Sequence, residues 1–118
     1  MAEENKYPLD YERRFGGVAK LYTKAGAERL KNAHVCVVGL GGVGSWAAEA
    51  LARTAVGRIT LVDLDNVAES NTNRQLQAMT GVYGKPKVDA TAERIHAINP
   101  LCDCRKIEDF IEVETAES

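Results

Sequence analysis

Apolar residues are gathered into three short runs that alternate with two stretches of helical periodicity. The runs lie at 34–39, 59–62 and 101–107, and their β-branched residues are typical of strands. Between the first two runs, apolar residues follow the i, i+3, i+4, i+7, i+8 spacing of a helix with one buried stripe: Val43, Trp46, Ala47, Ala50 and Leu51. A second helix is predicted from Pro86 to the pair Asn99-Pro100, which stops it.

This order of strand, glycine turn, helix, strand, helix and strand predicts an α/β fold. We expect residues 34–118 to form the first half (βαβαβ) of a Rossmann-like, doubly wound parallel sheet. The first run is apolar on both faces, so we expect a fully buried strand with Cys36 as a small buried thiol. We expect Trp46 to pack in the core. Because the second half of such a sheet is missing, the chain is predicted to be the N-terminal part of a longer domain.

The residues before the first strand are predicted to be helical. Residues 1–9 are polar and are expected to form a flexible tail. From 10 to 33 apolar residues recur at helical spacing, but Gly16-Gly17 and Gly26 interrupt them, which predicts two short helices and not one long helix.

Composition narrows the classes of function. The 118 residues carry a formal net charge of -2, which gives no general attraction to nucleic acid. No apolar run approaches the ~20 residues of a membrane span, and the start of the chain lacks the apolar centre of a signal peptide. We therefore expect a cytoplasmic protein with no membrane partner. The three cysteines include no C-x-x-C pair, and we assign them neither a disulfide nor a metal.

A glycine-rich turn links the first predicted strand to the first helix. Its pattern is Gly39-x-Gly41-Gly42-x-Gly44. Glycines let the backbone turn sharply and come close to a phosphate, and the start of the following helix offers free N–H groups to an anion. A plain tight turn is the alternative. We interpret these four glycines as part of a nucleotide site.

Acidic residues follow the second predicted strand. Asp63 lies at its carboxyl end, where a carboxylate can accept hydrogen bonds from ribose hydroxyls. Asp65 either faces the same way or caps the loop. By themselves the glycines and Asp63 fit NAD as well as ATP.

Two cations favour a triphosphate. Arg74 can bind two phosphate oxygens at once, and Lys87 lies in the first turn of a predicted helix, where the helix dipole disfavours a cation. The amides of Asn71 and Gln75 lie close to Arg74 in the sequence. Arg74 could instead organise its loop through hydrogen bonds to the backbone, and Lys87 could be a solvated surface residue.

These motifs, in this order, resemble the adenylating domain of ubiquitin-activating-enzyme-like proteins, which include the ThiF, MoeB and HesA groups. The resemblance rests on the glycine turn, Asp63-x-Asp65, Ser70-x-x-Asn73-Arg74-Gln75 and Gly84-Lys85-Pro86-Lys87, and it runs from about Arg13 to Pro100. Further matches at Arg14-Phe15-Gly16-Gly17, at 44–54 and at 71–75 resemble the tRNA threonylcarbamoyladenosine dehydratase branch.

The resemblance implies an enzyme that uses ATP and Mg²⁺ to adenylate a carboxylate. In the dehydratase branch this is the threonyl carboxylate of a modified adenosine in tRNA, which then cyclises. By matched position, Gly42 and Asp63 contact the nucleotide, and Asn71, Arg74 and Lys87 approach its phosphates. Arg14 resembles an arginine that the partner subunit of a homodimer inserts into the site. The metal-binding aspartate and the tRNA-contacting region of the family would lie beyond Ser118.

Two other functions stay open at this point. A ubiquitin-like or sulfur-carrier protein could supply the carboxylate at its C-terminus, with the same ATP chemistry. A nicotinamide-dependent oxidoreductase would use the glycines and Asp63, but it would leave Arg74, Gln75 and Lys87 without a role.

Overall fold

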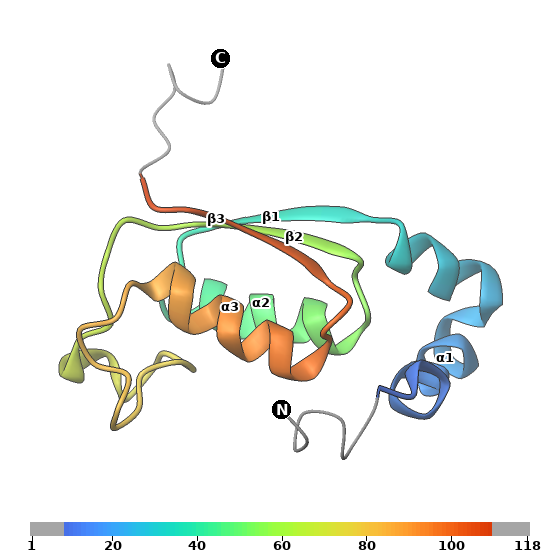
Figure 1. The fold of residues 1–118 in the computed structure, drawn as a ribbon, viewed down its shortest axis with the longest axis horizontal. Helices are drawn as coiled ribbons and strands as arrows, with labels where there is room; N and C mark the ends of the chain where they lie inside the picture. Colours follow the sequence, from blue (N-terminus) through green and yellow to red (C-terminus); the bar gives the residue numbers. More distant parts are fainter. Residues whose placement is uncertain (1–8, 110–118) are drawn as a thin grey trace.

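A three-stranded parallel sheet forms the centre of the protein (Figure 1). The structure, a computed structural model, describes residues 9–109. The strands β1 (His34–Val38), β2 (Arg58–Val62) and β3 (Asp103–Ile107) are paired in the order β1-β2-β3, with Val35 opposite Ile59 and Ile59 opposite Cys104. Helix α2 (Gly44–Arg53) connects β1 to β2, and α3 (Lys87–Ile98) lies between β2 and β3. The predicted α/β fold class is confirmed.

The core lies between the sheet and these two helices. Val37, Ile59 and Leu61 point toward Ala48 of α2 and Ile95 of α3, and together they make one buried cluster. Each large aliphatic side chain buried here stabilises the fold by about 1.5–3 kcal/mol. Among residues 9–109, no helix is both long and apolar enough to cross a membrane.

The first strand is not buried on both faces. Helices α2 and α3 lie on the same face of the sheet, and no described helix covers the other (Figure 1). Val38 of β1 is therefore 58% exposed and Cys36 is also exposed. The prediction of a fully buried strand with a buried Cys36 thiol is wrong for the described chain.

Helix α2 uses a different face from the predicted one. Its buried residues are Ser45, Ala48 and Ala52, whereas Val43 at its N-cap position is 85% exposed and Trp46 is 53% exposed. Small side chains face the sheet because the helix begins against the preceding turn, where bulky residues would hold it away. The prediction that Trp46 packs in the core is wrong.

Helix α1 (Tyr11–Lys31) confirms the prediction of two helical segments but not the place of the break. The backbone leaves helical geometry at Thr23, whose φ is 69° and ψ is 168°. The Thr23 hydroxyl accepts a hydrogen bond from the Gly26 backbone N–H at 3.2 Å, the contact of a residue that caps a new helix start. Gly16, Gly17 and Gly26 are themselves helical. The tail predicted at 1–9 lies outside the described residues, except for Leu9.

A long connection from β2 to α3 carries most of the polar motif residues. It contains a short 3-10 helix, η1 (Glu69–Asn71), and is anchored by a second apolar cluster of Val67, Ala78 and Ala90. An isolated bridge between Asn66 and Pro86 brings the two ends of the connection together. The connection is therefore held close to the sheet and can position side chains at its edge.

Candidate nucleotide site at the carboxyl edge of the sheet

The glycines of the turn between β1 and α2 fall into two pairs. Gly39 has a φ of +87°, and a Cβ on Gly44 would lie 1.7 Å from the Gly39 carbonyl oxygen. The fold itself requires glycine at both positions. A Cβ on Gly41 or Gly42 would meet only ordinary contacts at 3.8–3.9 Å, with Gln75 and Arg74 respectively. The fold therefore leaves these two positions free for another purpose.

Asp63 binds the glycine turn to the end of β2. Its carboxylate accepts hydrogen bonds from the backbone N–H groups of Leu40 and Asp65, each at 2.7 Å. A carboxylate oxygen has more than one lone pair, so each can accept a further bond from a hydroxyl group. Asp63 thus holds the turn in place and is still able to accept from a ligand.

A hollow of about 190 Å³ lies at the carboxyl ends of the strands. It is lined by Gly39, Asp63 and the exposed Asp65, which shows that Asp65 faces the same way as Asp63, and the binding of a ligand there stays a prediction. Asp109, which follows β3, also lines the hollow, and it was not among the residues predicted for the site. Asp109 could have been predicted from its position just after the third strand, because the carboxyl ends of parallel strands lie at the same edge of a sheet.

Arg74 lies against the glycine turn and organises its own loop. Its guanidinium Nη1 donates to the Ser70 carbonyl oxygen at 3.0 Å and to Asn73 Oδ1 at 2.9 Å. Asn71 is buried, and its Oδ1 accepts from the Ala68 backbone N–H at 2.9 Å. Arg74 and Asn71, the two residues predicted to approach phosphate, therefore both make structural hydrogen bonds here. The Asn71 side chain is buried, so it is less free than Arg74 to exchange its partner for a ligand.

The loop around Arg74 is joined to the start of α2 by side-chain hydrogen bonds. The Ser45 hydroxyl donates to the Gly41 carbonyl oxygen at 2.6 Å and accepts from the Leu76 N–H at 3.2 Å. The indole Nε1 of Trp46 donates to the Arg74 carbonyl oxygen at 3.1 Å. Gln75 is buried beside Gly41, and its Oε1 has no hydrogen-bond partner among the described residues.

Lys87 is the first residue of α3 and is only 7% exposed. Its backbone N–H donates to the Asp65 carbonyl oxygen at 2.9 Å, which places it at the same edge as the glycine turn. Within residues 9–109 the Lys87 ammonium makes no hydrogen bond or ion pair. The side chain of Lys87 is therefore mostly covered by the protein, unlike that of an ordinary surface lysine, and its contact with phosphate stays a prediction. A charged phosphate oxygen at this edge would give the ammonium a charge-assisted partner.

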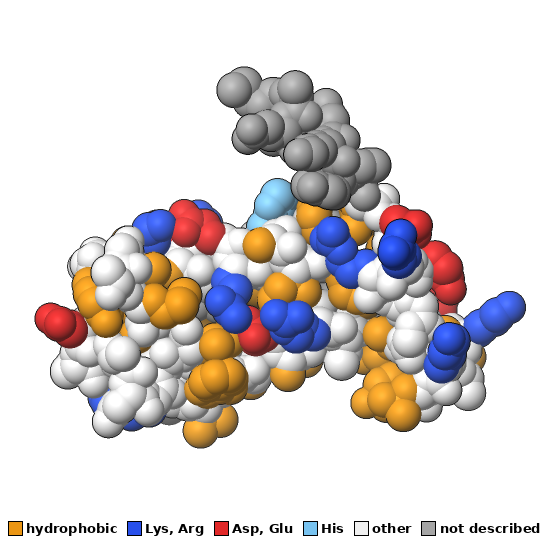
Figure 2. Space-filling view, turned by 90° about the horizontal axis from the view of Figure 1, so that it is seen from below, with side chains coloured by type: hydrophobic (Ala, Val, Ile, Leu, Met, Phe, Trp, Pro, Cys, Tyr) orange, Lys and Arg blue, Asp and Glu red, His pale blue; other side chains and the backbone are white. Residues whose placement is uncertain are grey.

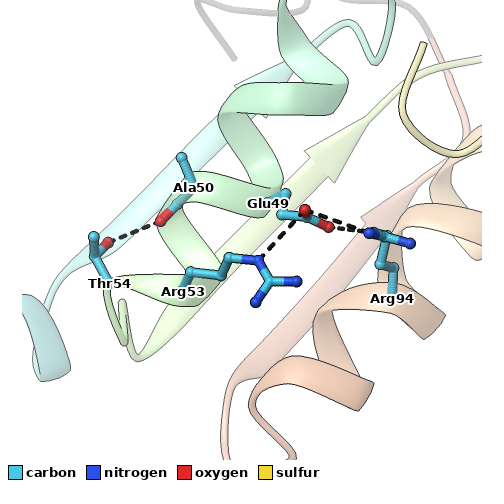
Figure 3. A network of polar contacts seen from close by, with 5 residues as sticks. All are labelled: Glu49, Ala50, Arg53, Thr54 and Arg94. Atoms are coloured by element: carbon cyan, nitrogen blue, oxygen red, sulfur yellow. Dashed lines mark hydrogen bonds and ion pairs between the residues drawn. The ribbon is translucent and has the colours of Figure 1, made fainter. Parts of the chain in front are cut away.

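Arg14 is not part of this edge. Its Nη1 donates to the carbonyl oxygen of Ile98, the last residue of α3, at 3.1 Å. It lines a cavity of about 430 Å³ with Arg53, the last residue of α2, and with Arg94. Glu49 of α2 accepts from both of these arginines and so links α2 to α3 (Figure 3). Arg14 thus lies at the opposite ends of the two helices from the glycine turn.

The space-filling view confirms that the helical face has a mixed charge (Figure 2), with basic and acidic side chains next to one another. The hydrogen bond from Arg94 holds the pKa of Glu49 below its ordinary value.

Residues 9–109 include no group of three His, Cys, Asp or Glu side chains that could hold a metal. Burial, reinforced by Cys102, raises the pKa of the Cys104 thiol to about 11, so this thiol stays protonated at neutral pH.

The chain is similar to enzymes that act on tRNA. The sequence profile of the ThiF family matches residues 11–118. A tRNA threonylcarbamoyladenosine dehydratase of Haemophilus influenzae is 51% identical over 105 residues, which cover 89% of this chain and 40% of the relative. The crystal structure of the Escherichia coli enzyme TcdA in complex with ATP superimposes with a TM-score of 0.85 at 51% identity, covering 86% of this chain and 42% of that one.

A second group of relatives acts on another type of substrate. The molybdopterin-synthase adenylyltransferase of Salmonella typhimurium is 45% identical over 75 residues, which cover 64% of this chain and 30% of the relative. The chain thus spans well under half the length of the curated relatives that it matches.

Proposed function

The chain belongs to the ThiF family, as the sequence motifs predict, and we propose that it is part of an ATP-dependent enzyme that adenylates a carboxylate. The proposed reaction is the cyclising dehydration of N6-threonylcarbamoyladenosine in tRNA. The higher identity to the dehydratase than to the adenylyltransferase favours this substrate. We assign residues 34–118 to one half of a larger adenylating domain and residues 10–33 to a helical segment that precedes it.

The observation that carries the proposal is the charge at the carboxyl edge of the sheet. Buried Lys87 has no counter-charge within the described chain, and Arg74 lies beside Gly42, where the backbone is bare. A pyrophosphate resting on a helix start needs neither cation, whereas the leaving pyrophosphate of ATP develops charge that both can stabilise. A nicotinamide cofactor would leave these two side chains without a role.

The proposed chemistry is one substitution followed by one cyclisation. A carboxylate oxygen attacks the α-phosphorus of ATP, the bond from that phosphorus to the β-phosphate bridging oxygen breaks, and pyrophosphate leaves with the electron pair. A nucleophile within the same substrate then attacks the acyl carbon, closes the ring and expels AMP. The sum is loss of water from the substrate and hydrolysis of ATP to AMP and pyrophosphate.

Each motif residue has a proposed part in the first step. The backbone N–H groups at the start of α2 bind phosphate oxygens. The glycines of the preceding turn let the phosphates come close to the backbone: Gly39, Gly41, Gly42 and Gly44. Asp63 accepts from the ribose, with Asp65 beside it. Arg74 and Lys87 act as catalytic cations on the phosphates, and the amides of Asn71 and Gln75 support them.

We propose that Mg²⁺ enters with ATP. Asp63 and Asp65 offer oxygen ligands of the type that Mg²⁺ prefers, but the described residues hold no group of three such side chains. The cation would therefore be held mainly by phosphate oxygens, and it would neutralise their charge. The acidic residue that the family uses for it is expected outside residues 9–109.

The proposed assembly is a homodimer in the cytoplasm, where both ATP and tRNA are present. The contacts with tRNA are assigned to parts of the protein outside this chain, because the chain has a net charge of -2. Arg14 is proposed as a catalytic cation that one subunit provides to the other. The large apolar side chains of Leu21 and Tyr22 on α1 are exposed, which supports an interface on this helix, whereas Phe15 of the same helix is buried within its own chain.

ATP–pyrophosphate exchange by the full-length protein tests the function. The two substrate arms are tRNA that carries N6-threonylcarbamoyladenosine and a ubiquitin-like sulfur-carrier protein with a free C-terminus. Exchange that depends on the modified tRNA supports the dehydratase. Exchange that depends only on the carrier protein would replace it with the adenylyltransferase function, and tighter binding of NAD than of ATP would overturn both.

A further inference from the structure

The side chain of Trp46 belongs to neither of the two buried apolar clusters of the described chain. It lies in the first turn of α2, next to the glycine turn, and more than half of its surface is exposed. The neighbouring Ser45 is buried and holds the turn. Because burial of the large apolar ring is incomplete, the polar atom of the indole makes the more specific contact. That atom, the indole Nε1, is a donor only.

The indole donates to the backbone of Arg74, 28 residues further along the chain. The distance from Nε1 to the Arg74 carbonyl oxygen is 3.1 Å. On another side, the Cβ and Cγ atoms of Arg74 lie 3.9 and 3.8 Å from the position of a Cβ on Gly42. The backbone of Arg74 is therefore held between α2 and the glycine turn, the two elements that form the proposed phosphate site.

The hydrogen bonds of the Arg74 guanidinium are easier to replace than those of its backbone. Its two acceptors, the Ser70 carbonyl oxygen and Asn73 Oδ1, are neutral, and both bonds are exposed to water. A charged phosphate oxygen is a better acceptor than either. The guanidinium can therefore exchange its partners for a phosphate while the backbone that carries it stays in place.

We infer that Trp46 is a positioning residue for Arg74, an inference that rests on the proposed function of this site. Without the indole N–H, the Arg74 carbonyl binds water and the loop gains freedom relative to α2. A displacement of about 1 Å at a group that contacts the transition state is enough to slow a reaction markedly. The folded state loses little, because Ser45 to Leu76 and Gln77 to the Leu40 carbonyl still hold the loop.

Trp46→Phe in the full-length protein separates this role from others. Phenylalanine keeps an aromatic ring, so stacking on a base would persist, whereas the N–H donor is lost together with part of the ring area. We expect the kcat of ATP–pyrophosphate exchange to fall about three- to tenfold, the effect of one neutral hydrogen bond. The KM for ATP should stay within about twofold and Tm within about 2 °C.

The matched control is Thr54→Val. Thr54 also donates a side-chain hydrogen bond to the backbone of α2, at 3.1 Å to the Ala50 carbonyl oxygen, but at the far end of the helix (Figure 3). We expect its kcat to equal that of the wild type. A kcat loss as large as that of Trp46→Phe would show a general effect of loosening α2 and would overturn the inference.

A double-mutant cycle completes the test. In an Arg74→Ala background there is no guanidinium to position, so adding Trp46→Phe should change kcat by less than about 1.5-fold. An unchanged kcat in the single variant, or losses that multiply in full in the double variant, would overturn the role of Trp46 alone. A wild type that catalyses no exchange with either carboxylate substrate would overturn the proposed function, and this inference with it.

Discussion

The two pairs of glycines in the turn between β1 and α2 predict opposite outcomes for the same substitution. A Cβ on Gly44 would lie 1.7 Å from the Gly39 carbonyl oxygen, whereas real contacts of this kind are at least 3.0 Å. Gly44→Ala must therefore move two backbone segments apart by more than about 1 Å. Overpacking of this severity costs about 2–4 kcal/mol. In a protein of the relatives' size, Tm should fall by about 5–15 °C.

Gly42→Ala should fold normally but bind ATP poorly. Its Cβ would meet nothing closer than 3.8 Å, and its φ is not in the left-handed region. Stability should change by less than about 1 kcal/mol, because alanine also restricts the unfolded chain. If phosphate oxygens reach the bare backbone here, the added methyl group occupies their place. We expect the Kd for ATP to rise at least about tenfold, or 1.4 kcal/mol.

Thermal unfolding and calorimetric titration with ATP in the presence of Mg²⁺ measure the two effects separately. Gly17→Ala in α1 is the control, since nothing lies within 4 Å of its Cβ. It should bind ATP like the wild type and gain about 0.5–1 kcal/mol of stability. A Gly44→Ala protein that melts like the wild type would refute the close packing of the turn. Unchanged ATP binding by Gly42→Ala would refute the approach of the ligand to this backbone.

Three further predictions test the cations and the ion pairs. Lys87→Met should lower the rate of exchange at least about 100-fold, whereas Lys85→Met, at a lysine that is paired with Glu93 on the surface, should leave it unchanged. Glu49→Gln should lower the free energy of unfolding by about 1–2 kcal/mol at pH 7. Arg94 lowers the pKa of Glu49 below 4.5, so this stabilisation exists above pH 4.5 and is lost as the pH falls through the folded-state pKa; denaturation at about pH 3 should show a smaller difference. Mixed dimers of Arg14→Ala and Lys87→Met subunits should regain activity at one of their two sites, and no recovery despite subunit exchange would refute a role in trans.

Strand positions and the second helix could be predicted from the sequence because their signals are local. The apolar runs at 34–39 and 59–62 match β1 and β2 within one residue at each end. Pro86 and Asn99 bracket α3, since proline has no N–H to donate and Asn99-Pro100 cannot continue a helix. These residues fix the backbone whatever packs around them.

The buried face of α2 could not be predicted in the same way. The stripe with Val43 and Trp46 and the stripe with Ser45, Ala48 and Ala52 share one helical period, and hydropathy favours the bulkier stripe. The choice depends on the close approach of Gly44 to Gly39, a contact between backbone atoms that hydropathy does not report. The hydrogen bond from Trp46 to Arg74 could not be predicted from hydropathy either, because it depends on the path of the loop that carries Arg74.

For the site, the residue types were predictable but their surroundings were not. Glycines, an acid after β2 and two cations indicate phosphate chemistry by their type alone. That Lys87 is buried and Asn71 holds its own loop follows from the connection between β2 and α3, whose path is set by the small cluster around Val67. Sequence alone could not distinguish a lysine that is mostly buried from one that is solvated.

The position of Arg14 makes its proposed role in catalysis depend on a second copy of the chain. Helix α2 has 10 residues and is therefore about 15 Å long, with the glycine turn at its start and Arg14 beside its end. An arginine side chain is too short to span that length, so Arg14 cannot reach the phosphate edge of its own chain. In a two-fold symmetric pair, the Arg14 end of each copy can face the glycine turn of the other, and both contacts are then equivalent. The bond from the charged Arg14 guanidinium to the neutral Ile98 carbonyl is weaker than a bond to an oppositely charged phosphate oxygen, so phosphate can replace Ile98 as its acceptor.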